Sequence, residues 1–421
     1  MRRFINQALQ TSTFRQSVVT VFSTFATAGL GAVFYLFLAR LVGAHEYGLF
    51  SVVISFLTIV ATIADLGMNQ GLIRFVAENS QSNQYQPYAK IALLSKLLIS
   101  SIILVGFVFL AQPITGYLLH QQEVYPLLPL AGLGAVFILL FSFSTSVLQG
   151  LQKFVLWGGL QVAANFFRLV LFGTLFLILK INAYWGLILF GSAPFLGFVV
   201  SWFWLPLSIF QSKFTPRQFC NFWNFNKWTA AFVTTSVLAS RLDILLSARF
   251  LSLSETGVYS LATTMVAFLP QLSGAIGAVT APKFASFSDS SHSQKYLAKA
   301  ALFSFGTSLA VALAMIPAAL VVVWFIGRDF SASFTPFLIL LASLAIFTSL
   351  NPVRDSIMYF YKRPQFFFWA NLAQAAIIVA VGLLLIPRFG VVGTALAVLI
   401  SHIFFAVASF MEYENCRAHH S

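Results

Sequence analysis

The stretch that decides the fold reads ARLVGAHEYGLFS at residues 39–51, and it recurs as ARFLSLSETGVYS at residues 248–260. The two stretches are offset by 209 positions (248 minus 39), and at this offset the identical pairs are Ala39 and Ala248, Arg40 and Arg249, Glu46 and Glu255, Gly48 and Gly257, and Ser51 and Ser260. Because 209 is close to half of the 421 residues, the sequence predicts two copies of one structural unit.

The composition is that of a membrane protein. Hydrophobic residues make up 59% of the chain and charged residues only 8%, whereas soluble domains contain about 25% charged residues. Apolar stretches recur that are each long enough to cross about 30 Å of hydrocarbon as a helix. We identify twelve, near residues 18–39, 47–66, 91–111, 125–148, 155–179, 184–208, 228–248, 257–281, 300–326, 334–353, 365–386 and 390–411.

The basic residues predict how these helices cross the membrane. With the N-terminus inside, 17 Lys and Arg residues fall on the cytoplasmic side and 5 on the outer side, and Arg168 and Arg241 remain within the membrane. This asymmetry predicts a multi-pass membrane protein with both termini cytoplasmic. It also accounts for the net charge of +13 without a nucleic-acid partner.

The predicted fold class is an all-α polytopic membrane protein of about twelve transmembrane helices. Residues 1–210 are expected to form an N-terminal six-helix lobe and residues 228–421 a C-terminal one, joined by a cytoplasmic interfacial linker at 211–227. Both lobes run in the same direction across the membrane, so a pseudo-twofold axis along the membrane normal relates them. Two lobes in one chain make a monomer sufficient.

One family resemblance follows from these segments. Residues 38–78, LARLVGAHEYGLFSVVISFLTIVATIADLGMNQGLIRFVAE, resemble the first hairpin of bacterial polysaccharide flippases of the multidrug/oligosaccharidyl-lipid/polysaccharide exporter superfamily. Residues 240–288 resemble the matching stretch of their second half, and Gly390-Val391-Val392-Gly393 is typical of their last helix. The repeats differ where Gly43 and Asp65 become Ser252 and Gly274.

The resemblance implies a transporter and not an enzyme. It would move a polyprenyl-diphosphate-linked oligosaccharide from the cytoplasmic to the outer leaflet for surface polysaccharide biosynthesis, by alternating access of its two lobes. The implied partners are the lipid-linked glycan, membrane lipids and polysaccharide polymerase or assembly proteins.

Arg168 is the leading candidate for a substrate ligand. It lies midway along a predicted helix, where a charge is costly and therefore faces protein or water. Gln161, Asn165 and Arg168 are spaced i, i+4, i+7 and share one helical face. A guanidinium flanked by amides suits a phosphate or sugar hydroxyls. The alternative is a structural arginine bonded to carbonyls or to a carboxylate of a neighbouring helix.

Two further helices carry polar faces. Thr24 belongs to a face of small polar residues in the first predicted helix, and Ser236 and Asp243 belong to one in the seventh. These faces are expected to meet across the pseudo-twofold axis in a hydrated cleft; the alternative is close packing through small residues. Arg241, near the outer interface, and Arg354, after a proline in the tenth helix, are further substrate-binding candidates.

Competing functions follow from the same residues. A cation-coupled multidrug exporter of the same superfamily would use an intramembrane carboxylate, and Asp243 is the deepest one. A membrane polysaccharide polymerase or ligase would need a long outer loop, and the longest, at 112–124, is short. The sequence contains no HExxH, P-loop or CxxC motif, so it predicts no catalytic residues, metal or cofactor. Asp65 is expected to pair with Arg74 or to cap the next helix.

Overall fold

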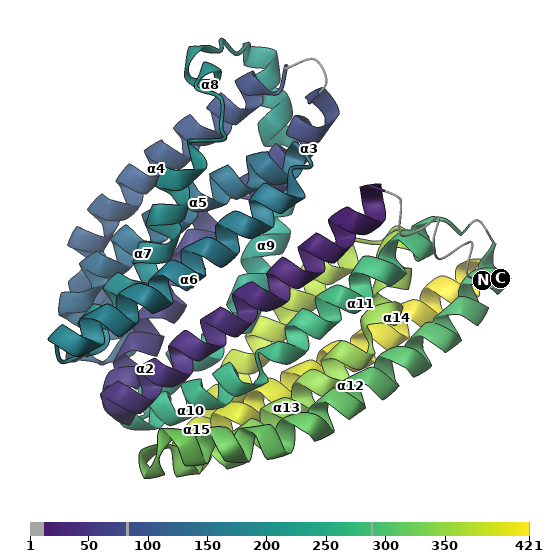
Figure 1. The fold of residues 1–421 in the computed structure, drawn as a ribbon. Helices are drawn as coiled ribbons and strands as arrows, with labels where there is room; N and C mark the ends of the chain where they lie inside the picture. The colour runs from purple at the N-terminus through teal and green to yellow at the C-terminus, as the bar shows by residue number, and fades with distance from the viewer. Residues whose placement is uncertain (1–11, 81–83, 288, 421) are drawn as a thin grey trace. The chain divides into compact units, whose positions relative to one another are not determined.

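The computed structural model describes residues 12–80, 84–287 and 289–420, and this part of the chain is helical without any strand (Figure 1). The α-helices are α2 (Ser12–Ala64), α3 (Met68–Asn79), α4 (Gln86–Pro113), α5 (Leu128–Gly150), α6 (Phe154–Ile178), α7 (Ala183–Ser201), α8 (Ser208–Gln211), α9 (Pro216–Phe250), α10 (Leu253–Val266), α11 (Phe268–Ala285), α12 (Ser290–Ile326), α13 (Phe334–Ser349), α14 (Asn351–Asp355) and α15 (Gln365–His420). Shorter π and 3₁₀ turns are η1 (Ile114–Leu119), η2 (Gln122–Leu127), η3 (Arg328–Ser333) and η4 (Ser356–Phe360).

The predicted number of membrane spans is confirmed. In the described residues, 10 helical stretches are long and apolar enough to cross a membrane. Two of them are double, because α2 is interrupted at Gly43 (φ 79°, ψ 175°) and α15 at Gly390 (φ 57°, ψ −133°). Only glycine adopts these positive φ values without strain. Counting the two parts of each separately gives twelve spans, so the chain is an all-α polytopic membrane protein.

The chain divides into two compact units. Of the described residues, unit 1 comprises 12–35, 56–80, 84–117 and 122–234, and unit 2 comprises 36–55, 118–121, 235–287 and 289–420. Unit 2 therefore takes two short segments from the first half of the sequence. The lobe boundaries expected at residues 210 and 228 stay a prediction.

Unit 1 is built around α5, which packs against α3, α4, α6 and α7. Its core includes Phe75, Phe143 and Phe222, and the ring centroids of Phe75 and Phe222 are 5.9 Å apart. Phe222 belongs to the first turns of α9, a helix that Pro216 opens with its preset φ. Most of the segment 211–227 is thus helical, and the Phe222 side chain is buried in this core.

In unit 2, α13 packs against α10, α12 and α15. The predicted span at 257–281 is broken between α10 and α11. The cause is Pro270, which has no N–H to donate to the carbonyl of Val266, four residues earlier. α10 accordingly ends at Val266, and α11 starts two residues later.

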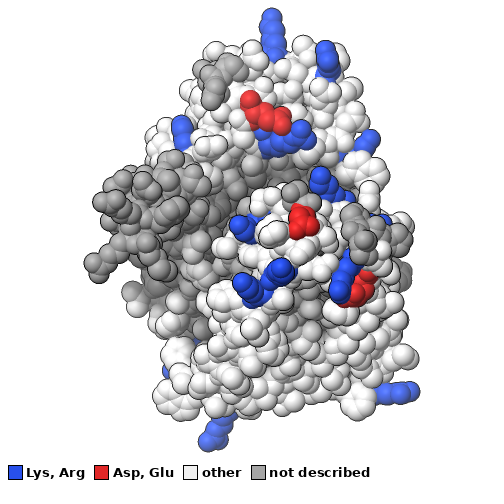
Figure 2. All heavy atoms as spheres, turned by 90° about the vertical axis from the view of Figure 1, so that its right-hand side faces the viewer, with Lys and Arg blue, Asp and Glu red and all other residues white. Residues whose placement is uncertain are grey.

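The helices turn apolar side chains outward. Large exposed side chains include Phe109 in α4, Leu177 in α6 and Trp324 in α12. Figure 2 shows a face on which uncharged residues cover most of the area and basic side chains are more frequent than acidic ones. An apolar exterior of this extent is what a helix bundle presents to lipid.

Candidate functional site

Arg168 is buried in unit 1, on α6, with only 5% of its surface exposed. Its guanidinium carbon lies 4.4 Å from the centre of the Phe34 ring of α2 and 5.8 Å from that of Phe190 of α7. Gly31 of α2 lies beside the guanidinium, because a Cβ there would be in van der Waals contact with Nη2, at 3.8 Å. Aromatic faces stabilise a desolvated guanidinium by about 2 kcal/mol.

The hydrogen bonds of Arg168 leave donor capacity unused. Nη2 donates to Oδ1 of Asn165 over 2.7 Å, and Nδ2 of Asn165 donates to the backbone oxygen of Gln161 over 2.9 Å. Nε is buried and has no hydrogen-bond partner among the described residues. No carboxylate of the described residues forms an ion pair with Arg168. A guanidinium with five donors held in this way is suited to an oxyanion.

Some of the hydroxyl groups on the polar face of α2 beside this arginine already donate hydrogen bonds, and one does not. Oγ1 of Thr24 donates to the backbone oxygen of Thr20 over 2.8 Å, and Oγ of Ser23 donates to that of Val19 over 2.7 Å. Oγ1 of Thr27, one turn before Gly31, is buried without a hydrogen-bond partner among the described residues. Thr27 therefore has a hydroxyl proton that is not donated within the described part of the protein, whereas Ser23 and Thr24 keep only acceptor capacity.

Asp243 of unit 2 is buried and already hydrogen-bonded. Its Oδ2 accepts from the hydroxyl of Tyr259 over 2.6 Å, and its Oδ1 accepts from the backbone N–H of Ile244 over 2.9 Å. On the same helix Ser236 is exposed and Arg241 is half-buried. Tyr259, in α10, is a partner that the sequence analysis did not identify.

Arg354 lies in unit 2, in the short helix α14. Its Nη2 donates to Oγ of Ser273 over 3.2 Å and to Oδ1 of Asn351, and its guanidinium carbon is 4.0 Å from the centre of the Phe347 ring. The neighbouring carboxylate, Asp355, accepts from Thr280 instead. Like Arg168, Arg354 has a buried Nε without a hydrogen-bond partner in the described part of the chain.

The structure thus brings together one part of the predicted set. Gln161, Asn165 and Arg168 form a continuous hydrogen-bonded face in unit 1, beside the helix that carries Thr24. The other candidates, Ser236, Arg241, Asp243 and Arg354, belong to unit 2. The expected meeting of polar faces from α2 and α9 stays a prediction.

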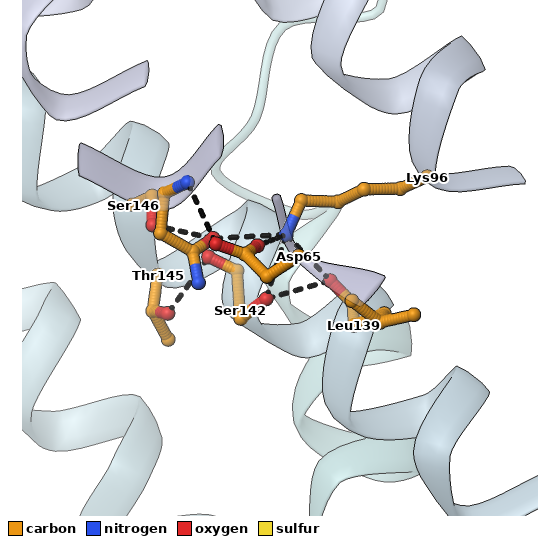
Figure 3. Close-up of polar contacts among 7 residues, drawn as sticks. Asp65, Lys96, Leu139, Ser142, Thr145 and Ser146 are labelled. Carbon is orange, nitrogen blue, oxygen red and sulfur yellow. Dashed lines mark hydrogen bonds and ion pairs between the residues drawn. The ribbon is translucent and has the colours of Figure 1, made fainter. Parts of the chain in front are cut away.

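Lys96 is one of the 17 basic residues predicted on the cytoplasmic side, although it lies inside the predicted span 91–111. In the structure Lys96 belongs to α4 and is completely buried. Its Nζ lies 2.5 Å from Oδ1 of Asp65, to which it donates a hydrogen bond (Figure 3). It has three further oxygen neighbours, which are Oδ1 of Asn69 and Oγ of Ser142 at 2.9 Å each and the backbone oxygen of Leu139 at 3.3 Å. Sixteen cytoplasmic cations, 17 minus Lys96, still outnumber the outer 5.

Asp65 therefore pairs with Lys96 and not with Arg74, which pairs with Glu78 over 2.8 Å. The expected capping role is present, because Oδ2 of Asp65 accepts from the backbone N–H of Asn69 in α3 over 3.2 Å. An ammonium with four oxygen neighbours has no donor left for a ligand. The Lys96 cluster therefore ties α3, α4 and α5 to the end of α2.

Replacing Lys96 by methionine should destabilise the protein by about 3–5 kcal/mol, because it leaves Asp65 as an unpaired buried charge. The matched control is Arg74→Met, which breaks a half-exposed pair and should cost about 1 kcal/mol or less. Unfolding in detergent would measure both. Adding Asp65→Asn to Lys96→Met should recover part of the loss, and a Lys96→Met protein as stable as Arg74→Met would contradict the assignment.

Comparisons with known proteins agree with the fold and the class of protein. The family model described as polysaccharide biosynthesis protein matches residues 14–288. The chain is 24% identical over 395 residues to the probable low-salt glycan biosynthesis flippase Agl15 of Haloferax volcanii, covering 92% of this chain and 80% of the relative.

Among the described residues, no group of three His, Cys, Asp or Glu side chains could hold a metal ion.

Two solved structures share the fold at low sequence identity. The lipid II flippase MurJ in an inward closed conformation matches with a TM-score of 0.76 and 15% identity, covering 94% of this chain and 87% of that one. An inward-facing multidrug resistance MATE transporter of the MOP superfamily matches with a TM-score of 0.75 and 12% identity, covering 96% and 98%.

Proposed function

Because this chain belongs to the polysaccharide biosynthesis protein family, we propose that it is a flippase for a polyprenyl-diphosphate-linked oligosaccharide. The proposal includes transfer from the cytoplasmic to the outer leaflet by alternating access, in which no covalent bond of the substrate changes. Its support is the similarity to a glycan biosynthesis flippase along most of the chain and the fold shared with a lipid II flippase.

The observation that carries the proposal is the environment of Arg168. A diphosphate has the charge and the oxygen acceptors that its unused donors require, and Phe34 and Phe190 exclude water from beside it. Asn165 and Gln161 hold the guanidinium in place. A cationic drug would be repelled by the same group.

The remaining candidate residues have assigned roles in the proposal. Arg241 and Arg354, which both belong to unit 2, are proposed to supply further positive charge for an anionic substrate. Thr24, Ser236 and Asp243 offer hydroxyl and carboxylate oxygens to the sugar hydroxyls. Each is a proposal that single substitutions would test in the assay described below.

The proposal includes a location in the inner membrane with both termini cytoplasmic. The support is the excess of basic residues on the predicted cytoplasmic side. In this orientation the membrane potential assists outward movement of an anion by about 2.3 kcal/mol per charge per 100 mV.

A multidrug exporter is the second candidate function, favoured by the almost equal fold similarity to a MATE transporter. Such a protein would use Asp243 to bind a coupling cation. In the structure this carboxylate accepts one hydrogen bond at each oxygen, from Tyr259 and from Ile244, and keeps further lone pairs.

Reconstitution in liposomes tests the proposal. A fluorescent polyprenyl-diphosphate oligosaccharide is placed in both leaflets, and a membrane-impermeant reagent then destroys the accessible label. With the wild-type protein the protected inner pool should disappear, whereas a neutral lipid carrying the same glycan should stay protected because it lacks the diphosphate. Transport of cationic dyes, with no movement of the labelled glycolipid, would instead establish the exporter.

A further inference from the structure

Two arginines of the repeated sequence stretch lie outside the proposed substrate site. Arg40 and Arg249 occupy equivalent positions in the two halves, 209 residues apart. Both belong to unit 2, because this unit includes residues 36–55 of the first half. The predicted topology puts both at the outer ends of their helices.

Arg40 reaches the end of α12. Its Nη1 donates to the backbone oxygen of Phe325 over 2.7 Å, and its guanidinium carbon lies 4.2 Å from the centre of the Phe325 ring. The ring of Phe37 packs on Phe325 as well, with centroids 5.5 Å apart. α12 ends at Ile326, so the accepting carbonyl belongs to its last turn.

Arg249 makes the corresponding contact with a segment of the first half. Its Nη1 donates to the backbone oxygen of Leu118 over 2.9 Å, in the π turn η1 that continues α4 to its end at Leu119. Gln121 strengthens this contact, because its Nε2 donates to the backbone oxygens of Ala248 and Leu251 over 2.8 and 3.1 Å.

The two contacts are reciprocal. An arginine of the first half binds the end of a helix of the second half, and its repeat partner binds the equivalent helix end of the first half. The accepting residues, Leu118 and Phe325, are 207 positions apart, close to the repeat offset. The last carbonyls of a helix lack partners within it and carry the negative end of its dipole, so a guanidinium is well suited to bind them.

A tight helix crossing lies next to these contacts along the chain. A Cβ on Gly48 would collide with the backbone of Leu253 and Gly257, and a Cβ on Gly257 would collide with the backbone of Ala44. Gly48 and Gly257 are again repeat partners. The second part of α2 and α10 thus meet along a seam that also belongs to both halves of the sequence.

We propose that Arg40 and Arg249 form a two-point latch that holds the predicted outer ends of the two sequence halves together, and that both arginines release these carbonyls when the transporter opens to the outside. This inference rests on the proposed function, because only a transporter that opens on both sides needs a reversible closure. Charge-assisted hydrogen bonds to single carbonyls suit that purpose, since water replaces them readily at an interface.

The test measures how often the seam opens. Ser51 and Ser260 are buried and lie three residues after Gly48 and Gly257, on the same helical faces. Ser51→Cys and Ser260→Cys are made separately in a protein lacking its two native cysteines, Cys220 and Cys416. A membrane-impermeant maleimide added outside should label both slowly, and about tenfold faster when Arg40→Gln and Arg249→Gln are combined, because two solvent-exposed hydrogen bonds are lost, each of which contributes less than a desolvated one.

Controls separate latch opening from damage. Arg328→Gln removes an exposed arginine near the end of α12 that makes no hydrogen bond or ion pair among the described residues, and it should leave labelling unchanged. Arg40→Lys with Arg249→Lys keeps donors and charge and should label nearly as slowly as the wild type. A cysteine at Ala131, fully buried in unit 1 near the predicted outer end of its helix, reports unfolding and should stay unlabelled throughout.

An unchanged labelling rate in the double glutamine protein, or an equal rise in Arg328→Gln, would overturn the latch. Labelling needs no glycan, so the two ideas can fail separately. If the variants label faster although the wild type moves no glycolipid, the proposed function fails and the latch stands. If the glycolipid moves and labelling ignores both arginines, only the latch fails.

Discussion

Arg168→Ala is expected to abolish movement of the lipid-linked glycan while the protein accumulates in the membrane at its normal amount. Arg168 has no carboxylate partner among the described residues, so its removal leaves no opposite charge unpaired there. What is lost is the group that would bind the diphosphate. Two charge-assisted hydrogen bonds of roughly 1.5–3 kcal/mol each correspond to a fall in rate of at least about 100-fold.

Arg168→Lys should keep part of the activity, because the charge survives while the planar fork that binds two oxygens is lost. The measurements are glycolipid movement in liposomes and the amount of each variant in the membrane. Arg388→Ala, at an exposed position, is the matched control for loss of one positive charge. Full activity of Arg168→Ala, or a loss explained entirely by missing protein, would remove Arg168 from the substrate site.

The second large effect is expected at the helix crossing of Gly48 and Gly257. Gly48→Ala should destabilise the protein by about 3 kcal/mol or more, since overpacking usually costs 1–3 kcal/mol and this overlap is with backbone atoms that no side-chain rotation can move. Gly257→Ala should behave in the same way. Both would lower the midpoint of unfolding in detergent and the amount of protein in the membrane.

Gly306→Ala and Gly173→Ala are the controls, because a Cβ at either position meets no atom within 4 Å. In a helix alanine is favoured over glycine by about 1 kcal/mol, so these proteins should be as stable as the wild type or slightly more so. Equal stability of Gly48→Ala and Gly306→Ala would show that the crossing is not tight.

The spans could be predicted from the sequence because their length and apolar character do not depend on packing. The turns at Gly43 and Gly390 each divide a long helix into two spans. The twelve apolar stretches predicted from the sequence already gave these spans as separate helices. The face of Gln161, Asn165 and Arg168 could be predicted for a similar reason, since residues on one helix are placed by their spacing alone.

Contacts between helices could not be predicted in this way. Lys96 was misplaced because its partners, Asp65, Asn69 and Ser142, come together only when helices pack. The repeat identifies Arg40 and Arg249 as equivalent residues. Each binds a backbone carbonyl, however, and because every residue has a backbone carbonyl, the sequence does not indicate which one is the acceptor. Nothing in the sequence distinguishes Phe325 or Leu118 as an acceptor.

The composition of unit 2 has a consequence for dividing the gene. A cut in the polar stretch around Ser212 would look harmless, since it falls between the two repeats. Yet the C-terminal fragment would lack residues 36–55 and 118–121, and Gly257 would lose the backbone of α2 that it packs against. Neither fragment alone contains a whole unit 2, so a split protein has to be made by co-expressing both fragments in one membrane.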